Sequence, residues 1–289
     1  DGLLKLIDEC DAQIVLTSLV GAAGIEPTLH AIEKGMDIAL ANKETLVAAG
    51  ELVMKEAVAR GVRILPVDSE HGAIFQCLQG RRPEEVAKLL VTASGGPHFR
   101  RPALEFSSIT VEQCLKHPTW NMGGKITIEA HWLFHMPFDK IEVVIQPQSI
   151  IHSMIEFIDG SVLAQLGMPD MRLPIQYAFT YPERMTVRGA RPIDWKTLGT
   201  LEFFPPDDEK FPSIGLAYEA GRIGGTMPCV LNGANEVAVY AFLRKEISFT
   251  RIFDIVRTVM ERHTVSHDVT LASIRQADAW ARRCAASLL

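Results

Sequence analysis

Strand-like and helix-like segments alternate through the first third of the chain, and this alternation constrains the fold more than any other feature. Residues 13–16, 37–40 and 62–67 are short apolar runs typical of buried strands. Between them, residues 26–34 and 44–60 carry helix signals, with Pro27 near the start of the first and Gly61 just past the end of the second. Strands that alternate with helices predict a parallel α/β sheet.

The remainder of the chain follows a different pattern. Strands are predicted at 88–92, 141–145, 153–158 and 161–166, and Asp159-Gly160 between the last two is a strong hairpin signal. From residue 213 onward, apolar residues recur at helical spacing, and we expect three of the helices to be capped by Asn232, Ser248 and Thr270. The fold class is therefore α/β plus α+β with a helical C-terminal part.

These patterns divide the chain into four parts. We assign residues 1–67 to the parallel α/β domain, 68–185 to a central α+β domain and 213–289 to a C-terminal helical domain. Residues 186–212 are interpreted as a linker, because five prolines fall between Tyr181 and Pro212.

Composition narrows the classes of partner. The net charge of −6 makes the chain a poor general binder of nucleic acid, which requires clustered Lys and Arg. No apolar run approaches the roughly 18–20 residues that span a bilayer, so we expect no membrane partner. The five cysteines lie far apart with no Cys-x-x-Cys, which fits a reducing cytoplasm. The chain begins with Asp1 rather than Met, so we expect it to be a fragment.

The tripeptide Asp68-Ser69-Glu70 directly follows the third predicted strand. In an extended segment, residues two apart point to the same side, so both carboxylates would converge at the carboxyl end of the sheet, where open α/β sheets bind ligands. Paired carboxylates suit Mg²⁺ or Mn²⁺. A solvated loop or a helix cap is the alternative interpretation.

Two glycine-containing segments are further candidates for a site. Ser94-Gly95-Gly96-Pro97 follows a predicted strand and either lets backbone N–H groups approach an anion or forms a tight turn. Residues 117–125 combine histidine, tryptophan, methionine and glycines, as in a lid over a site or an ordinary surface loop. No Gly-x-Gly-x-x-Gly or Walker-type loop is present.

Three other histidines are expected to be structural. His131 and His135 stand four apart in a helical stretch, a spacing that suits a metal, but without a His-Glu-x-x-His pattern we favour helix packing. We interpret His152 as structural as well.

Taken together, seven segments closely resemble one family, the 1-deoxy-D-xylulose 5-phosphate reductoisomerases. The segments are Ala41-Asn42-Lys43-Glu44-Thr45-Leu46-Val47, Pro66-Val67-Asp68-Ser69-Glu70-His71, Thr92 to Pro97, His117 to Lys125, Gln148 to Met154, Val162 to Arg172 and Leu231 to Ala238. They occur in the family's order from one end of the chain to the other.

The resemblance implies an NADPH domain, of which residues 1–67 are a remnant with Rossmann-like character, a central catalytic domain and a helical domain, assembled as a homodimer. It implies conversion of the sugar phosphate 1-deoxy-D-xylulose 5-phosphate to 2-C-methyl-D-erythritol 4-phosphate, in the non-mevalonate pathway of isoprenoid biosynthesis. NADPH and Mg²⁺ or Mn²⁺ are the implied cofactors, and a bacterial cytoplasm or a plastid is the implied location.

The family's roles carry over by matching residues. The implied metal ligands are Asp68, Glu70 and, if the helix slides by one turn, Glu129. The implied catalytic residues are Lys43, Glu70 and His117. The implied substrate contacts are Lys43, Ser69, Glu70, Ser94, His117, Trp120 and Met122, and those to NADPH are Asn42, Glu44 and Gly123.

This chain departs from the family pattern in two places. It lacks the Gly-x-Thr-Gly-Ser-x-Gly phosphate loop, so we expect it to open part-way through the NADPH domain with an exposed sheet edge. After Ile128 the family continues with about a dozen residues that carry a substrate serine, phosphate contacts and the third metal carboxylate, whereas here Glu129 follows at once.

Three hypotheses remain open. The first is a reductoisomerase whose natural gene product is longer than this chain. The second is a catalytically inactive relative that acts as a binding or dimerisation module. The third is a different oxidoreductase that shares the fold, which the retained Asp68-Ser69-Glu70 and Ser94 argue against.

Overall fold

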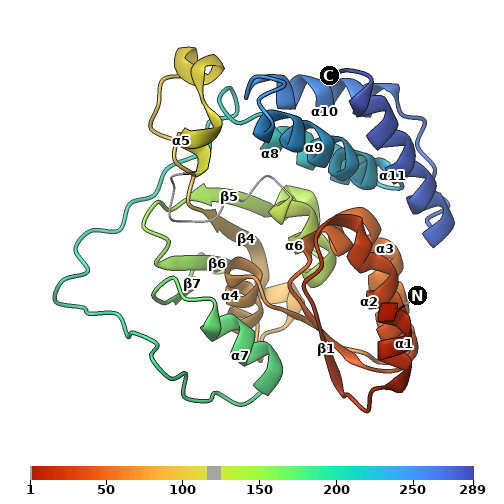
Figure 1. Cartoon of the computed structure of the whole chain (residues 1–289). Coiled ribbons are helices and arrows are strands. Elements are labelled where there is room, and N and C mark those ends of the chain that lie inside the picture. Colours follow the sequence, from red (N-terminus) through yellow and green to blue (C-terminus); the bar gives the residue numbers. More distant parts are fainter. Residues whose placement is uncertain (1, 116–124) are drawn as a thin grey trace.

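The computed structural model describes residues 2–115 and 125–289, and it places two sheets side by side beneath a layer of C-terminal helices (Figure 1). The first sheet has the order β1-β2-β3 and is parallel throughout. Its strands are β1 (Ile14–Thr17), β2 (Asp37–Leu40) and β3 (Ile64–Pro66). The predicted parallel α/β arrangement is therefore confirmed.

The helices of this first unit follow the predicted order. They are α1 (Gly2–Glu9), α2 (Ile25–Glu33) and α3 (Lys43–Arg60). Gly61 ends α3 in the left-handed conformation, with φ of 65°, as expected of a C-cap glycine. The α3 helix connects β2 to β3, so its N-terminus lies at the carboxyl end of the sheet.

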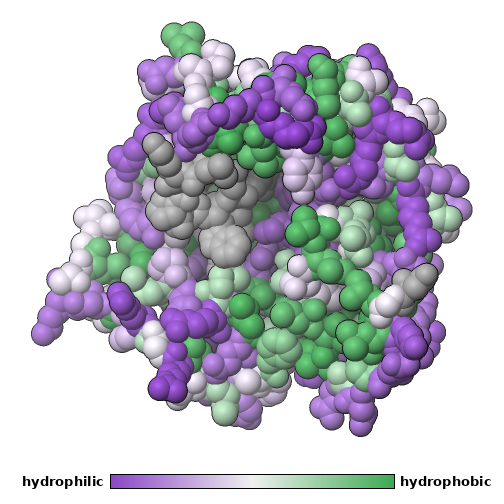
Figure 2. Space-filling model, in the orientation of Figure 1, coloured by the Kyte–Doolittle hydropathy of each residue, from purple (hydrophilic) through white to green (hydrophobic). Residues whose placement is uncertain are grey.

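The strand β1 forms an edge of this sheet, because it pairs only with β2 among the described strands. Leu16 on β1 and Val20 just after it are exposed, the latter to 77%. Figure 2 shows hydrophobic residues gathered over this part of the surface. The expected open sheet edge is therefore present.

The second sheet is mixed and has the order β5-β4-β6-β7. Its strands are β4 (Val86–Ala93), β5 (Ile141–Ile145), β6 (Ile151–Phe157) and β7 (Val162–Leu166). The β6–β7 hairpin turns at Gly160, which has φ of 82°, so the Asp159-Gly160 signal is confirmed. The helices α4 (Ser69–Cys77), α5 (Val111–Leu115), α6 (Ile126–Phe134) and α7 (Arg172–Thr180) accompany this sheet.

The segment from Tyr181 to Pro212 contains no helix or strand. It returns to the second sheet at one point, where Phe204 and Ile145 exchange two backbone hydrogen bonds of 2.9 Å. The segment predicted as a linker is thus irregular but attached to the sheet.

Four helices form the C-terminal layer. They are α8 (Ser213–Ile223), α9 (Met227–Leu243), α10 (Arg251–Arg262) and α11 (Leu271–Ala286). A single apolar core joins this layer to α2 and α3, with Ile32, Leu46, Val230, Ile255 and Ile274 among its fully buried side chains. No helix of the described residues is long and apolar enough to cross a membrane.

The expected caps of these helices are confirmed in one case of three. Thr270 caps α11, accepting a hydrogen bond from the Ser273 N–H in a reciprocal capping box. The predicted cap at Asn232 was wrong, because α9 begins at Met227 and Asn232 lies buried inside this helix. The predicted cap at Ser248 was also wrong, because α10 begins at Arg251 and Thr250 occupies the N-cap position.

Candidate functional site

Four ionisable side chains from three helices gather where the two sheets meet. Lys43 is the first residue of α3, Asp68 directly precedes α4, His71 lies in the first turn of α4, and Glu129 lies on α6. The Lys43 ammonium donates a 2.7 Å hydrogen bond to Asp68 Oδ2. Because α3 and α4 follow directly on β2 and β3, this group lies at the carboxyl end of the parallel sheet, as the sequence predicts.

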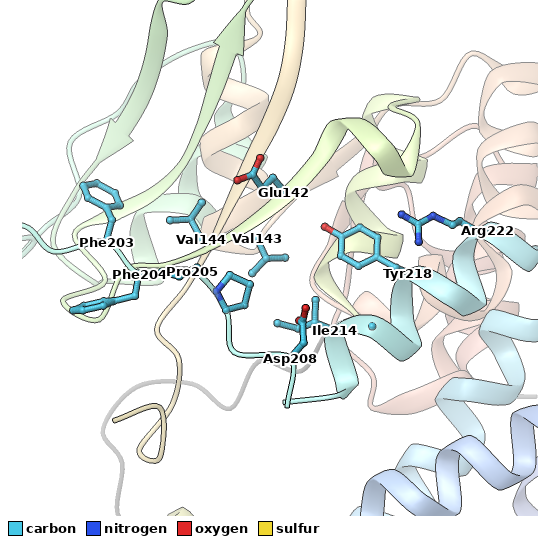
Figure 3. Close-up of a pocket in the computed structure, with 12 residues that line it drawn as sticks. Glu142, Val143, Val144, Phe203, Phe204, Pro205, Asp208, Ile214, Tyr218 and Arg222 are labelled. Atoms are coloured by element: carbon cyan, nitrogen blue, oxygen red, sulfur yellow. The ribbon is translucent and has the colours of Figure 1, made fainter. Parts of the chain in front are cut away.

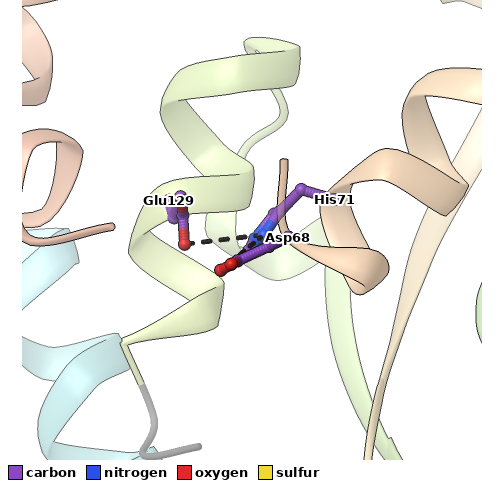
Figure 4. Close-up of side chains that lie close together, drawn as sticks. All are labelled: Asp68, His71 and Glu129. Atoms are coloured by element: carbon purple, nitrogen blue, oxygen red, sulfur yellow. Dashed lines mark ion pairs between the residues drawn. The ribbon is translucent and has the colours of Figure 1, made fainter. Parts of the chain in front are cut away.

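Asp68, His71 and Glu129 form the most compact part of this group, with one ligand atom from each within 4.8 Å of the others. Figure 4 shows the three side chains converging from α4 and α6. The distance from His71 Nδ1 is 3.5 Å to Glu129 Oε2 and 3.9 Å to Asp68 Oδ2. His71 is 0% exposed and Glu129 is 2% exposed.

Burial and neighbouring charges shift the pKa values of four side chains at this site. Burial, followed by the charge of Asp68, raises the pKa of Glu129 well above its ordinary value. Burial and Asp68 also raise the pKa of Glu70. Burial lowers the pKa of His71 and thus favours its neutral form. Burial also works against the charge of Lys43, but Asp68 and Glu129 outweigh it and raise the pKa of that ammonium.

The expectation that Asp68 to Glu70 form an extended segment was wrong, because helix α4 begins at Ser69. In a helix the residue three positions on lies on the same face, and His71 Nδ1 is 3.9 Å from Asp68 Oδ2. Glu70 Oε2 accepts a 2.9 Å hydrogen bond from Ser69 Oγ, and the charge of Asp68 still acts on the Glu70 carboxyl. The structure does not test the metal-binding role of Glu70, which stays a prediction.

A cavity of about 350 Å³ opens beside Lys43. Its polar lining comprises Lys43, Glu44, Ser94, His98, Lys125 and Asn235, and Gly95, Gly96 and several residues of the C-terminal helices complete it. Lys43 and Ser94, both predicted to contact substrate, therefore face one space. Lys125 Nζ lies 3.4 Å from Glu44 Oε1, and both line the same cavity.

The loop after β4 has the conformation that its glycines permit. Gly95 and Gly96 have φ of 77° and 67°, and the Gly96 N–H donates a 3.3 Å hydrogen bond to Ser94 Oγ. The loop exposes small residues to the cavity at the end of a strand. The tight turn is therefore observed, and the approach of an anion to this loop stays a prediction.

The other predicted contacts are distributed differently. Asn42 is buried, and its amide donates hydrogen bonds to the carbonyls of Leu19 and Gly21 and to Glu44, so it holds the turn after β1. Ser69 lines a separate cavity of about 260 Å³. His117, Trp120, Met122 and Gly123 lie outside the described residues.

The three histidines expected to be structural are held by backbone carbonyls or by a helix end. His131 Nδ1 donates to the Met136 carbonyl and its ring stacks on Phe138. His135 ends α6 in the left-handed conformation. His152 Nε2 donates to the Gly167 carbonyl over 3.1 Å.

A further cavity lies elsewhere and was not predicted from the sequence. It measures about 770 Å³ and lies between β5, the Phe203–Pro206 segment and α8 (Figure 3). Tyr218 donates to the Ile141 carbonyl over 2.6 Å, and burial raises the pKa of its phenol to about 12. None of the predicted site residues that the structure describes lines this cavity.

Comparison with known proteins identifies the family of this chain. Three family profiles match: "1-deoxy-D-xylulose 5-phosphate reductoisomerase" over residues 1–50, its C-terminal domain over 64–146, and "DXP reductoisomerase C-terminal domain" over 166–284. The reductoisomerase of Exiguobacterium sibiricum is 52% identical over 301 residues, covering 100% of this chain and 78% of that protein. That of Symbiobacterium thermophilum is 55% identical, covering 99% of this chain and 76% of that protein.

Solved structures agree with this match. The Zymomonas mobilis reductoisomerase in complex with NADPH has a TM-score of 0.93 at 40% identity, covering 100% of this chain and 78% of that one. A DOX-P reductoisomerase in complex with NADPH, fosmidomycin and magnesium has a TM-score of 0.93 at 38% identity, covering 99% and 78%. This chain therefore belongs to the 1-deoxy-D-xylulose 5-phosphate reductoisomerase family.

Proposed function

We propose that this chain carries out the reaction of its family, the NADPH-dependent conversion of 1-deoxy-D-xylulose 5-phosphate to 2-C-methyl-D-erythritol 4-phosphate. The observation that carries the proposal is the joint placement of Lys43, Ser94 and Lys125 on one cavity whose wall adjoins the buried carboxyl groups of Asp68 and Glu129. Cations and a glycine loop suit a phosphate, and the carboxylates suit a divalent cation.

The residues present fit a divalent cation. Glu129 Oε2 and His71 Nδ1 are buried and have no hydrogen-bond partner among the described residues, so they are available as ligands. A bound cation would supply Lewis acidity toward the oxygens of the substrate. Lys43, held by Asp68, would orient a substrate hydroxyl or carbonyl oxygen beside the carboxyl groups.

The residues around the cavity also suit a reduced nicotinamide cofactor in part. Glu44 and Lys125 face the cavity, so they are placed to contact a polar cofactor there. Asn42 positions Glu44, because its amide donates hydrogen bonds to Glu44 Oε2 and to the Gly21 carbonyl in the turn after β1. The roles of His117 at the substrate phosphate, of Trp120 and Met122 in covering the site and of Gly123 at NADPH stay part of this proposal.

Consumption of NADPH tests the proposed reaction. We expect the purified chain, with substrate and Mn²⁺ or Mg²⁺, to lower the absorbance of NADPH at 340 nm, and Lys43→Gln to remove that activity. Arg82→Gln, which changes an exposed residue that does not line the cavity, is the matched control. A chain that binds NADPH and substrate without turnover would contradict the proposal and support the inactive binding module instead.

We further propose that the chain forms a homodimer in the bacterial cytoplasm. The strand β7 is an edge strand with Val162 and Leu163 exposed, next to Ile158, which is 73% exposed. An exposed apolar edge can pair with the same edge of a second copy. Light scattering after size-exclusion chromatography measures the mass directly, and a mass of 32.0 kDa would contradict the dimer.

A further inference from the structure

One cysteine of this chain differs from the other four in its surroundings. Cys114 lies in the short helix α5 (Figure 1), and its Sγ is 3.5 Å from His98 Nε2. Both side chains line the cavity of about 350 Å³ beside Lys43. Among the residues that the structure describes, no other cysteine has a histidine partner, and Cys10 and Cys229 donate to backbone carbonyls instead. A thiol within reach of an imidazole has the arrangement of a nucleophile and its base.

Neighbouring groups hold this pair together. His98 follows the glycine loop after β4, is 5% exposed, and packs its ring edge-on against Phe249 with 6.1 Å between the ring centroids. The Arg101 N–H donates a 2.9 Å hydrogen bond to the His98 carbonyl, and the Arg101 guanidinium donates a 3.2 Å hydrogen bond to Gln113 Oε1. Gln113 directly precedes Cys114 on α5, so Arg101 joins the loop that carries the imidazole to the helix that carries the thiol.

The thiol of Cys114 needs a base before it can react, because the thiolate is the nucleophilic form of cysteine. Burial raises the pKa of the Cys114 thiol, and the charge of Arg101 opposes this shift without cancelling it. The group is therefore protonated at neutral pH. The imidazole of His98 is the acceptor that is placed to take this proton.

The charges of the cavity select the molecules that reach this thiol. Lys43 and Lys125 line the cavity with Glu44, so positive charges exceed negative ones among its described lining residues. Arg101 acts on the thiol as a further positive charge, and its guanidinium donates to a neutral amide. Phe249 and other aromatic side chains supply an apolar wall. A small anion with an apolar body is complementary to this space.

We propose that Cys114 and His98 form a thiol-modification site for small anionic disulfides on the wall of this cavity. The proton of Cys114 passes to His98 Nε2 while the Cys114 sulfur attacks one sulfur atom of the disulfide. The disulfide's own S–S bond breaks as the new one forms. Cys114 is thereby oxidised to a mixed disulfide, and the other half of the reagent is reduced and leaves as a thiol with the proton from the imidazolium.

The group left on Cys114 would occupy the space that Lys43 and Ser94 share, so modification would block the cavity. This consequence for catalysis rests on the proposed function. The reactivity of the thiol does not, because it depends only on the pair and on the charges around it.

Peptide mapping by mass spectrometry after brief exposure to dithiobis(nitrobenzoate), an anionic aromatic disulfide, tests the pair. We expect Cys114 to react at least about tenfold faster than Cys77, whose thiol pKa burial also raises but which lacks a base. His98→Gln should remove this advantage. His267→Gln, which changes an exposed histidine outside the cavity lining, is the matched control and should retain it.

Two results of this mapping overturn the inference. The first is a Cys114 that reacts no faster than Cys77 in the unchanged protein, which does not depend on how any variant folds. The second is an unchanged rate for Cys114 in a folded His98→Gln variant. Cys229, which is 0% exposed, reports on folding, because it stays unmodified while the variant is folded.

Cystamine, a small cationic disulfide, tests the preference for an anion. The rate at Cys77 in the same sample corrects for the different reactivity of the two reagents, since burial alone shifts the pKa of that thiol. We expect the ratio of the Cys114 rate to the Cys77 rate to be at least about fivefold lower with cystamine than with the anionic reagent. An equal ratio overturns the assignment of an anionic ligand.

The two proposals fail in different ways. The substrate 1-deoxy-D-xylulose 5-phosphate should slow the modification of Cys114 and not that of Cys77, because substrate and reagent would share one cavity. A reactive Cys114 that the substrate does not protect, in a chain that never consumes NADPH, would refute the proposed reaction and leave the pair intact. NADPH consumption by a chain whose Cys114 reacts no faster than Cys77 would refute the pair and leave the reaction intact.

Discussion

Replacing Gly50 by alanine tests how closely the helix that carries Lys43 packs against the helix that carries Glu129. Gly50 lies inside α3, and an ideal Cβ at this position would fall closer than 3.0 Å to three ring atoms of Trp132 on α6. Two opposing effects therefore set the sign of the change. Alanine is favoured over glycine in a helix interior by about 1 kcal/mol, and the overlap with the indole opposes it.

The surroundings decide which effect is larger. The cavity that adjoins Gly50, Trp132 and Phe138 holds only about 20 Å³, so the indole has no room to withdraw. The His131 ring lies 4.7 Å from the Trp132 ring on another side. Overpacking of a filled core costs typically about 1–3 kcal/mol, and the overlap with three ring atoms places this substitution in the upper part of that range. We therefore expect Gly50→Ala to destabilise the protein by about 1–2 kcal/mol net.

Thermal unfolding followed by circular dichroism measures this change. A loss of that size lowers the midpoint by about 2–3 °C for a chain of this length. Gly215→Ala is the matched control, because Gly215 lies in helix α8 and a Cβ there meets nothing within 4 Å, so its midpoint should hold or rise. In the Trp132→Leu background, Gly50→Ala should lose most of its cost, because the indole is gone. A Gly50→Ala variant as stable as the parent would refute the packing argument.

Three further predictions concern caps and the buried carboxyl group. Thr270→Ala removes the side-chain acceptor at the start of α11 and should lower the free energy of unfolding by about 1 kcal/mol in urea titrations, whereas Ser248→Ala should change it little. Gly61→Ala forces a side chain into φ of 65° and should cost about 1 kcal/mol in the same assay. Glu129→Gln should raise the thermal midpoint measured with a chelator at about pH 8. The pKa of Glu129 is raised in the native protein, so its carboxyl group contributes stability at pH values below its ordinary pKa. This contribution is lost as the pH rises through the raised pKa. The gain should vanish near about pH 4, and an equal effect at both pH values would contradict it.

The order of strands and helices could be predicted because it depends on local signals. Alternating apolar runs located β1 to β3, and the Asp159-Gly160 pair located the β6–β7 hairpin. Helix starts were harder to predict within the C-terminal layer. The N-cap residue of α9, Thr226, makes no side-chain cap, because its hydroxyl bonds His263. Asn232 resembles a cap in the sequence, although its amide bonds Glu236 inside the helix.

The candidate site could be predicted in its components but not in its pairing. The Asp68 carboxylate lies at the expected end of the sheet because Asp68 follows strand β3 almost directly. A strand followed by an acidic residue can be recognised within a few residues of sequence. Which further side chains lie beside it depends on where α4 begins, because a helical start places His71, three residues on, next to Asp68. A helix beginning at Ser69, with Asp68 at its N-cap position, is the signal that identifies His71.

Glu129 could not be placed by local signals at all, because its position depends on how α6 packs against α3 and α4. The family resemblance assigned the third carboxylate to residues that this chain lacks, and it allowed Glu129 to replace them only if the helix slides by a turn. In the structure Glu129 does reach Asp68, and it also reaches His71, whose lone pair has no other partner among the described residues. The packing of α6 against α3 and α4, and no signal within α6 itself, therefore brings Glu129 beside Asp68.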